Sequence, residues 1–264
     1  MRTIAIPLSN EGSKTSINTA YMNLLIGAKF IPMPLFQGAN EVETEEIFAH
    51  CDGLLLPGGI DLDPIHYGEN NWASQSVDPE KDAFERRLFW LAVNKGKPTF
   101  GICRGLQLIA REFIAANYHD VSRDLTFGQH IGDHTRNASL SIARTVPTHF
   151  VEVFNKFLYG DKEDKSTFKA VNSMHHQYLH CVTPEKQIRR RPLVSERLIV
   201  TAWTREGLAA KEAGVVIEGF IIPGWKTAAV QWHPEELSDF KLLQHFFHRG
   251  ANENYIFANG DVGA

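Results

Sequence analysis

The chain has 264 residues, of which 43% are hydrophobic and 22% are charged. This apolar content is enough for a sizeable core and excludes a chain that stays disordered. The formal net charge of -4 at pH 7 provides no general attraction to nucleic acid or to an anionic membrane. We therefore expect small-molecule partners.

Targeting signals and cysteine content favour the cytosol. No apolar run approaches the ~20 residues that would cross a bilayer, and residues 1–12 turn polar too soon for a secretory signal. The cysteines Cys51, Cys103 and Cys181 are widely separated, so they predict neither a disulfide framework nor the close pairs of a zinc site. The sequence therefore predicts a cytoplasmic protein with at least one free thiol.

Strands and helices alternate through the first half of the sequence. Apolar runs predict strands over 3–8, 30–35, 53–59 and 98–103. Helices are predicted over 18–28, 41–50, 84–92 and 105–113. In residues 60–80 the apolar positions follow neither a helical nor a strand period, which predicts a long loop. A long loop inside a compact domain tends to be functional.

The second half is less regular. Further strands are predicted over 148–154, 198–203, 215–222 and 227–232, and a closing helix over 240–247. The last two strands flank Pro223-Gly224 and predict a hairpin.

The order of these elements predicts an α/β fold. We expect a flavodoxin-like three-layer sandwich, with a mostly parallel central sheet and antiparallel additions in the C-terminal half. No linker divides the sequence. Residues 1–250 are therefore predicted to form one domain, and residues 251–264 a polar tail.

Cys103 lies at a predicted strand-to-helix turn between Gly101 and Gly105. Small neighbours of this kind permit the strained backbone of a nucleophile elbow. The helix that follows would favour the thiolate through its dipole. Taken alone, however, an isolated cysteine is more often a buried small hydrophobe.

Two other segments are predicted at the same edge of the sheet, where parallel α/β folds bind ligands. Pro57-Gly58-Gly59 follows a strand and could provide an oxyanion hole together with the N–H of Arg104, although alone it is an ordinary turn. His233 and Glu235 also follow a strand, and could supply the base and the carboxylate that a cysteine nucleophile requires.

The motifs LLLPGG (54–59), GICRGLQ (101–107) and QWHPE (231–235) together resemble the class I glutamine amidotransferase superfamily. The likeness is greater to its γ-glutamyl hydrolase-like branch, the C26 peptidases. The arginine after the nucleophile, the segment GGIDLDPIHYGE (58–69) and the segment VNSMHHQ (171–177) fit that branch.

This resemblance implies a Cys-His-Glu triad. In the family, residues at these positions have defined roles: Cys103 attacks a γ-glutamyl carbonyl, His233 is the general base and then the general acid, and Glu235 orients His233. The N–H groups of Gly59 and Arg104 hold the oxyanion.

The resemblance also implies how substrate binds. Gln107 would face the glutamyl end of the substrate, and His176 would line the pocket, with a structural loop histidine as the alternative. The reaction implied is hydrolysis of a γ-glutamyl amide through a thioester. It needs no metal or organic cofactor, and a homodimer is common in such proteins.

Two other functions share these residues. A glutaminase subunit that supplies ammonia to a synthase uses the same triad, although the sequence contains no synthase domain. A non-catalytic protein could use Cys103 as a thiol sensor, because cysteines at helix N-termini are prone to oxidation.

Some residues depart from the pattern or remain outside it. The family usually has a glycine pair where residues 115–120 read AANYHD, and residues 130–144 are hard to align. His130 and His134 are spaced as in some metal sites, but a solvated loop is the favoured interpretation. Adjacent His175 and His176 do not form a convincing metal site, because neighbouring side chains point apart. Arg189-Arg190-Arg191 predicts a solvent-facing loop, with an anion or carboxylate contact as the alternative.

Overall fold

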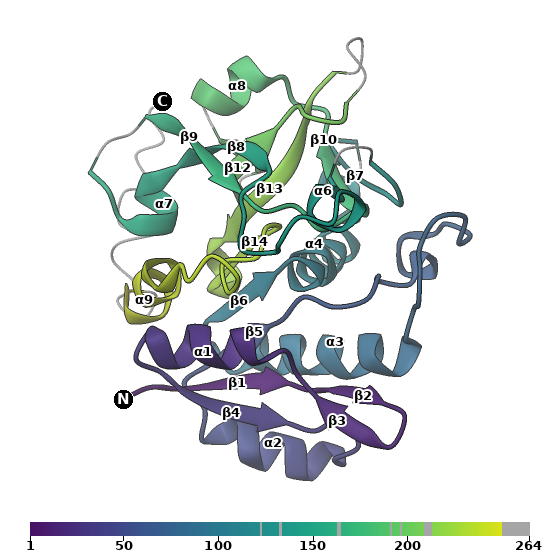
Figure 1. Ribbon diagram of the computed structural model, residues 1–264, viewed down its shortest axis with the longest axis vertical. Coiled ribbons are helices and arrows are strands. Elements are labelled where there is room, and N and C mark those ends of the chain that lie inside the picture. Colours follow the sequence, from purple (N-terminus) through teal and green to yellow (C-terminus); the bar gives the residue numbers. More distant parts are fainter. Residues whose placement is uncertain are drawn as a thin grey trace.

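The computed structural model describes residues 1–121, 123–131, 134–162, 165–190, 192–195, 197–208 and 213–249. The tail predicted over 251–264 lies outside these residues, as does Arg191. Within the described residues, one sheet of twelve strands forms the centre of the molecule, and helices cover both of its faces (Figure 1).

Parallel strands form one half of this sheet. Their order is β4 (Ile31–Leu35), β1 (Thr3–Pro7), β5 (Gly53–Leu56), β6 (Thr99–Ile102) and β14 (Thr227–Val230). If these five strands are numbered in chain order, their order across the sheet is 2-1-3-4-5, as in flavodoxin-like folds. The predicted parallel core is therefore confirmed. Its inner strands are apolar and fully buried, as a sheet covered on both faces requires.

Antiparallel strands continue the sheet beyond β14. They follow in the order β13 (Val215–Ile222), β12 (Leu198–Thr204), β8 (His149–Phe154) and β9 (Ser166–Val171). Three further strands branch from this row: β10 (Tyr178–Cys181), β7 (Leu125–Gly128) and β11 (Leu193–Ser195). The antiparallel additions in the C-terminal half, including the β13–β14 hairpin, are confirmed.

The longer helices form the two outer layers. One apolar cluster includes side chains of α2 (Glu41–Ala49), α3 (Pro79–Asn94) and α4 (Arg104–Ala116). The other includes side chains of α1 (Thr19–Gly27), α7 (Asn155–Tyr159) and α9 (Phe240–Arg249). Alternate residues of a strand point to opposite faces, so Leu54 and Leu56 join the first cluster and Leu55 the second. The three-layer arrangement is confirmed.

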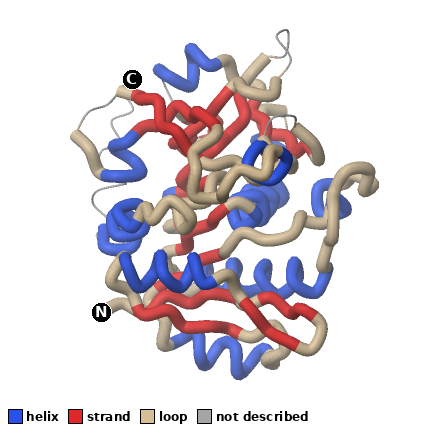
Figure 2. Tube along the Cα trace, in the orientation of Figure 1, coloured by secondary structure: helices blue, strands red, loops and turns tan. Residues whose placement is uncertain are grey.

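Local signals in the sequence set where these helices begin. Asn40 and Glu43 form a capping box at the start of α2. The side chain of Asp78 accepts hydrogen bonds from the first turn of α3, whose first residue is Pro79. Figure 2 shows that the segment between β5 and α3 is a long loop, interrupted by the short helix η1 (Pro64–Tyr67). The predicted loop is thus confirmed except for its last residues, which begin α3.

The sequence did not predict the shorter elements. These are β2 (Ser9–Glu11), β3 (Lys14–Ser16), α5 (Tyr118–Val121), α6 (Arg136–Ser139), α8 (Glu185–Arg190) and η2 (Pro223–Trp225), together with η1, α7, β7, β9, β10 and β11. Among the described residues, no helix is both long enough and apolar enough to span a membrane.

The prediction at Arg189 and Arg190 is right about exposure and wrong about the loop. Both residues are exposed but end α8, whose Ile188 is buried. Arg189 contacts the carboxylates of Glu152 at 2.6 Å and Glu185 at 2.7 Å, the latter one helical turn away. The alternative of a carboxylate contact is thus confirmed for Arg189, which anchors the helix to Glu152 of β8.

Candidate active site

Three loops meet at the carboxyl edge of neighbouring parallel strands, as the sequence predicts. Cys103 follows β6, Gly58 and Gly59 follow β5, and His233 follows β14. β6 pairs with β5 on one side and with β14 on the other (Figure 1). This is the edge at which doubly wound sheets bind their ligands.

The backbone at Cys103 has the conformation of a strained elbow. Its φ of 51° and ψ of -104° are unusual for a residue with a side chain. The Cys103 N–H donates to the Val230 carbonyl at 2.9 Å, which holds the turn against β14. A Cβ at Gly105 would lie 2.3 Å from the Leu56 carbonyl oxygen, so only glycine lets α4 approach β5 this closely.

His233 connects Cys103 to Glu235. Its Nδ1 lies 2.6 Å from Oε1 of Glu235, and Cys103 is close enough to affect the charge of the ring. Burial lowers the pKa of His233, but the negative charges of Glu235 and Cys103 outweigh it and raise this pKa to about 10. The imidazole is therefore held protonated at neutral pH, beside the sulfur atom.

Gly58 lies between the two reactive side chains. A Cβ at this position would stand 2.9 Å from Cε1 of His233 and 3.3 Å from Cβ of Cys103. A side chain here would thus push the base and the nucleophile apart, which explains why this position holds a glycine.

Asn172 fixes the backbone of His233. Its Oδ1 accepts from the His233 N–H at 2.9 Å, and its Nδ2 donates to the His233 carbonyl at 3.2 Å and to the Arg144 carbonyl at 2.7 Å. Sequence analysis included Asn172 in the VNSMHHQ segment but gave it no role. Its amide has the donor and the acceptor that this two-way contact needs.

Tyr21 is a further site residue that the sequence did not reveal. Its hydroxyl oxygen accepts from the Gly58 N–H at 2.9 Å, and Glu235 is close enough to affect its titration. Burial raises the pKa of Tyr21 well above its usual value, and the charges of Glu235 and Cys103 raise it further. The phenol thus stays protonated beside the catalytic pair. Sequence analysis placed Tyr21 within a predicted helix and gave it no role.

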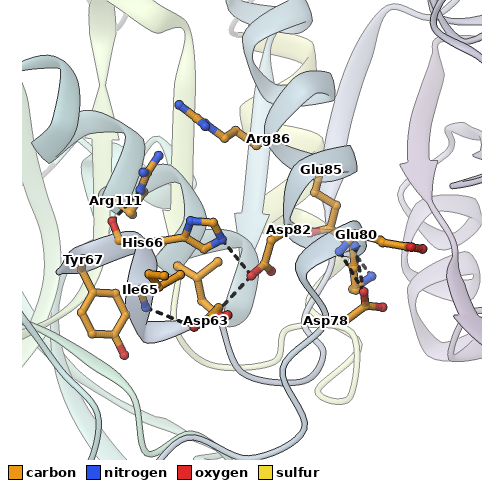
Figure 3. A network of polar contacts seen from close by, with 12 residues as sticks. Asp63, Ile65, His66, Tyr67, Asp78, Glu80, Asp82, Glu85, Arg86 and Arg111 are labelled. Carbon is orange, nitrogen blue, oxygen red and sulfur yellow. Dashed lines mark hydrogen bonds and ion pairs between the residues drawn. The ribbon is translucent and has the colours of Figure 1, made fainter. Parts of the chain in front are cut away.

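The side chain of Arg104 points away from the sulfur, into a buried network of charges. Its guanidinium contacts Asp82 and Glu85, and Lys81 lies 2.6 Å from Glu85. Figure 3 shows the same network extending from Asp82 to His66, which lies 3.1 Å away. These ion pairs anchor the start of α4. The backbone N–H of Arg104, in the first turn of that helix, has no carbonyl partner within the helix.

Of the two residues predicted to bind substrate, Gln107 contacts the VNSMHHQ segment and His176 belongs to it. Gln107 is buried, and its Nε2 donates to the Gln177 carbonyl at 3.2 Å. His176 lies 2.8 Å from the Gln129 carbonyl oxygen and 2.8 Å from Oδ2 of Asp61, at the start of the long loop. Contact of either residue with a substrate stays a prediction.

One expectation for the region 130–144 is wrong. His130 is exposed, as a solvated loop predicts, but His134 is completely buried. Its neighbours are His149, His175 and Glu218, which the sequence places far from it. His175 and His176 do point apart as expected, since His176 contacts Asp61 instead.

A hollow of about 460 Å³ lies elsewhere, between α2 and α3. Its lining includes Glu41, Phe84, Arg87 and Trp90, and none of the predicted site residues borders it. Convergent polar groups, and not the size of the hollow, therefore mark the candidate active site.

The architecture matches solved structures of one class. The glutaminase domain of Trypanosoma brucei CTPS, with bound acivicin, has a TM-score of 0.59 over 96% of this chain and 94% of its own, at 15% identity. A putative GMP synthase protein from Thermoplasma acidophilum has a TM-score of 0.56 over 97% and 98%, at 14% identity. The chain thus has the fold of the class I glutamine amidotransferase domains.

Sequence comparison gives the family. The Peptidase C26 family matches residues 6–235, and the chain belongs to this family of hydrolases. The γ-glutamyl-γ-aminobutyrate hydrolase of Escherichia coli O157:H7 is 28% identical over 236 residues, 88% of this chain and 84% of that protein. A putative glutamine amidotransferase-like protein, YvdE of Lactococcus lactis subsp. lactis, is 29% identical over 217 residues, 80% and 75% of the two chains.

Proposed function

We propose that the chain hydrolyses γ-glutamyl amides with Cys103 as the nucleophile, releasing glutamate and an amine. The observation that carries this proposal is the contact of His233 with both Cys103 and Glu235 at a strained strand-to-helix turn. Membership of the Peptidase C26 family and the similarity to a γ-glutamyl-γ-aminobutyrate hydrolase support the choice of bond.

The first half-reaction forms a thioester. An imidazolium at His233 stabilises the Cys103 thiolate, which attacks the γ-carbonyl carbon of the substrate. The carbonyl oxygen becomes an oxyanion, for which the N–H groups of Gly59 and Arg104 are the proposed donors. When the carbon–nitrogen bond breaks, the His233 proton passes to the leaving amine.

The second half-reaction releases glutamate. Neutral His233 takes a proton from water, and the resulting hydroxide attacks the thioester carbon. The carbon–sulfur bond then breaks, which restores the thiolate beside the imidazolium. Glu235 keeps the imidazole in the required tautomer throughout, and the protonated Tyr21 hydroxyl accepts from the Gly58 N–H beside this pair.

A substrate panel tests this function. The purified chain is assayed for glutamate release from γ-glutamyl-γ-aminobutyrate, a γ-glutamyl polyamine, a γ-glutamyl dipeptide and glutamine. We expect faster release from one of the substituted amides than from glutamine, and none from the Cys103→Ala variant. The matched control is Cys51→Ala, which removes another buried thiol outside the site and should retain the activity.

Each rival function predicts a different result. Preference for glutamine over every substituted amide would favour the glutaminase alternative, which the name of the Lactococcus relative also suggests. No glutamate release from any substrate, with oxidation of Cys103 by peroxide, would favour the thiol sensor.

A further inference from the structure

A second cluster of chemically active side chains lies outside the candidate active site. His134, His149, His175 and Glu218 meet in the interior, and each is at most 4% exposed. They come from different parts of the chain: the segment before α6, β8, the VNSMHHQ segment and β13. Their burial is unusual, because ionisable groups are rarely buried without a compensating partner.

The polar atoms of this cluster converge on one point. Oε1 of Glu218 lies 3.4 Å from Nδ1 of His134, 3.5 Å from Nε2 of His149 and 3.5 Å from Nε2 of His175. Nδ1 of His134 lies 3.1 Å from Nε2 of His175. Ligand atoms of His134, His149 and Glu218 all lie within 4.8 Å of one another.

Outward contacts determine which nitrogen of each ring carries a proton. Nε2 of His134 lies 2.9 Å from the Glu206 carbonyl oxygen, and Nδ1 of His175 lies 2.9 Å from the Gln177 carbonyl oxygen. Each of these nitrogens must donate, because a carbonyl oxygen only accepts. Nδ1 of His149 faces the Glu206 carboxylate but makes no regular hydrogen bond to it. The inward nitrogens of neutral His134 and His175 are therefore lone pairs, and a neutral His149 with its proton on Nδ1 presents a third.

The centre of the cluster thus consists of acceptors without a donor. Three imidazole nitrogens and a carboxylate oxygen face one another, and Oε1 of Glu218 and Nε2 of His149 have no hydrogen-bond partner. Unpaired buried acceptors are costly, so the arrangement requires a cation at its centre. Outward hydrogen bonds from imidazoles to carbonyls and a carboxylate are the usual outer contacts of metal-binding histidines.

We propose that His134, His149, His175 and Glu218 bind one divalent transition-metal ion of the zinc class. Three imidazole nitrogens and one carboxylate oxygen are a ligand set that Zn²⁺ accepts. Ligands about 2.0–2.1 Å from a tetrahedral ion stand roughly 3.3–3.4 Å apart. The separations of Glu218 Oε1 from the three nitrogens, and of His134 Nδ1 from His175 Nε2, are 3.1 to 3.5 Å and agree with this spacing. His149 and His134 offer ligand atoms within 4.8 Å of each other.

The ion would have a structural role. Protein groups fill all four positions of a tetrahedral site, so none is open for water or substrate. The ligands bracket the segment that positions the proposed base: Ser173 Oγ donates to the His134 carbonyl at 2.6 Å, and neighbouring Asn172 holds His233. The site therefore joins the antiparallel strands to the VNSMHHQ segment.

Metal analysis and cobalt titration test the proposal without reference to activity. The full chain is purified without a metal-affinity tag, and its metal content is measured by mass spectrometry. Chelator-treated protein is then titrated with Co²⁺, whose intense visible absorption reports a four-coordinate site. We expect about one ion per chain and saturation at one equivalent of Co²⁺.

Three variants locate the ion. His149→Gln should lose the bound metal and the cobalt absorption, whereas His130→Gln, which alters an exposed histidine of the same region, should retain both. Glu206→Gln removes the carboxylate that faces His149 and pairs with Arg136, and should weaken Co²⁺ binding by roughly 10–100-fold.

The alternative cation is a proton, held by His149 between Glu206 and Glu218. In that case wild-type protein would contain no metal and would give no four-coordinate cobalt spectrum, and the proposal would be wrong. Unchanged metal content in folded His149→Gln would also overturn it. Should that variant fail to fold, the wild-type titration decides the question by itself.

Discussion

At the scale of single residues, the chemistry depends on charges that are buried together. Burial alone would keep His233 neutral, and only the adjacent Glu235 and Cys103 raise its pKa to about 10. Tyr21 holds the neighbouring Gly58, and Asn172 fixes the backbone of His233. These two contacts join residues from different elements, so they exist only in the folded chain.

Replacing Glu235 by glutamine should lower kcat/KM by roughly 10²–10⁴-fold, because the imidazole loses the partner that orients it. The variant also loses a negative charge that raises the His233 pKa. The imidazolium therefore deprotonates earlier, and the alkaline limb of the pH–rate profile should move below about pH 10. Steady-state kinetics across the alkaline range measures both effects; an unshifted limb would contradict the assignment of His233.

At the scale of elements, glycines control how closely α4 approaches the sheet. The Leu56 carbonyl leaves no room for a side chain at Gly105, where a Cβ would lie 2.3 Å from its oxygen. The elbow at Cys103 therefore depends on the packing of a helix against a neighbouring strand as well as on local sequence.

The variant Gly105→Ala should lower the free energy of unfolding by about 1–3 kcal/mol, because α4 must move away from β5 to accommodate the methyl group. Gly38→Ala is the matched control, since nothing lies within 4 Å of a Cβ at that position. Urea denaturation compares the two variants. Equal stabilities would show that the close contact does not limit the fold.

The contact of His176 with Asp61 predicts a pH dependence of the long loop. The hydrogen bond to Asp61 raises the His176 pKa, although burial opposes it. A raised pKa means that this pair stabilises the fold fully below about pH 6.5, and that the contribution is lost as pH rises through the raised value.

Hydrogen exchange of residues 60–78 tests this prediction. Exchange rates corrected for the intrinsic effect of pH should increase from pH 6 to pH 8.5 in the wild type. In Asp61→Asn the corrected rates should change less, because the charged pair is absent. An equal increase in both proteins would contradict a role for the pair in holding the loop.

At the scale of the whole molecule, sequence analysis predicted the parallel core and the meeting of three loops at its edge. Buried strands such as GLLL and TFGI are continuous apolar runs, and an α/β topology places their carboxyl ends together. β7, β9 and β10 were not predicted, because they are short and contain polar residues. Their strand conformation is determined by pairing with neighbouring strands.

The cluster of buried histidines could not be predicted from the sequence. His134 is surrounded by polar and small residues in the sequence, which favoured a solvated loop. Its partners His149, His175 and Glu218 are contributed by separate segments, and no spacing rule connects them. Tyr21 and Asn172 were not predicted as site residues for the same reason, because their neighbours Glu235 and His233 lie far along the chain.

The proposed mechanism depends above all on Cys103 carrying the γ-glutamyl group during the reaction. Acid quenching of the purified enzyme during turnover of a cleaved γ-glutamyl amide, followed by mass spectrometry of its peptides, detects this intermediate. We expect a γ-glutamyl adduct on the peptide that contains Cys103, and none on the peptides of Cys51 or Cys181. Glutamate release by Cys103→Ala at the wild-type rate, without an adduct in either protein, would contradict the mechanism.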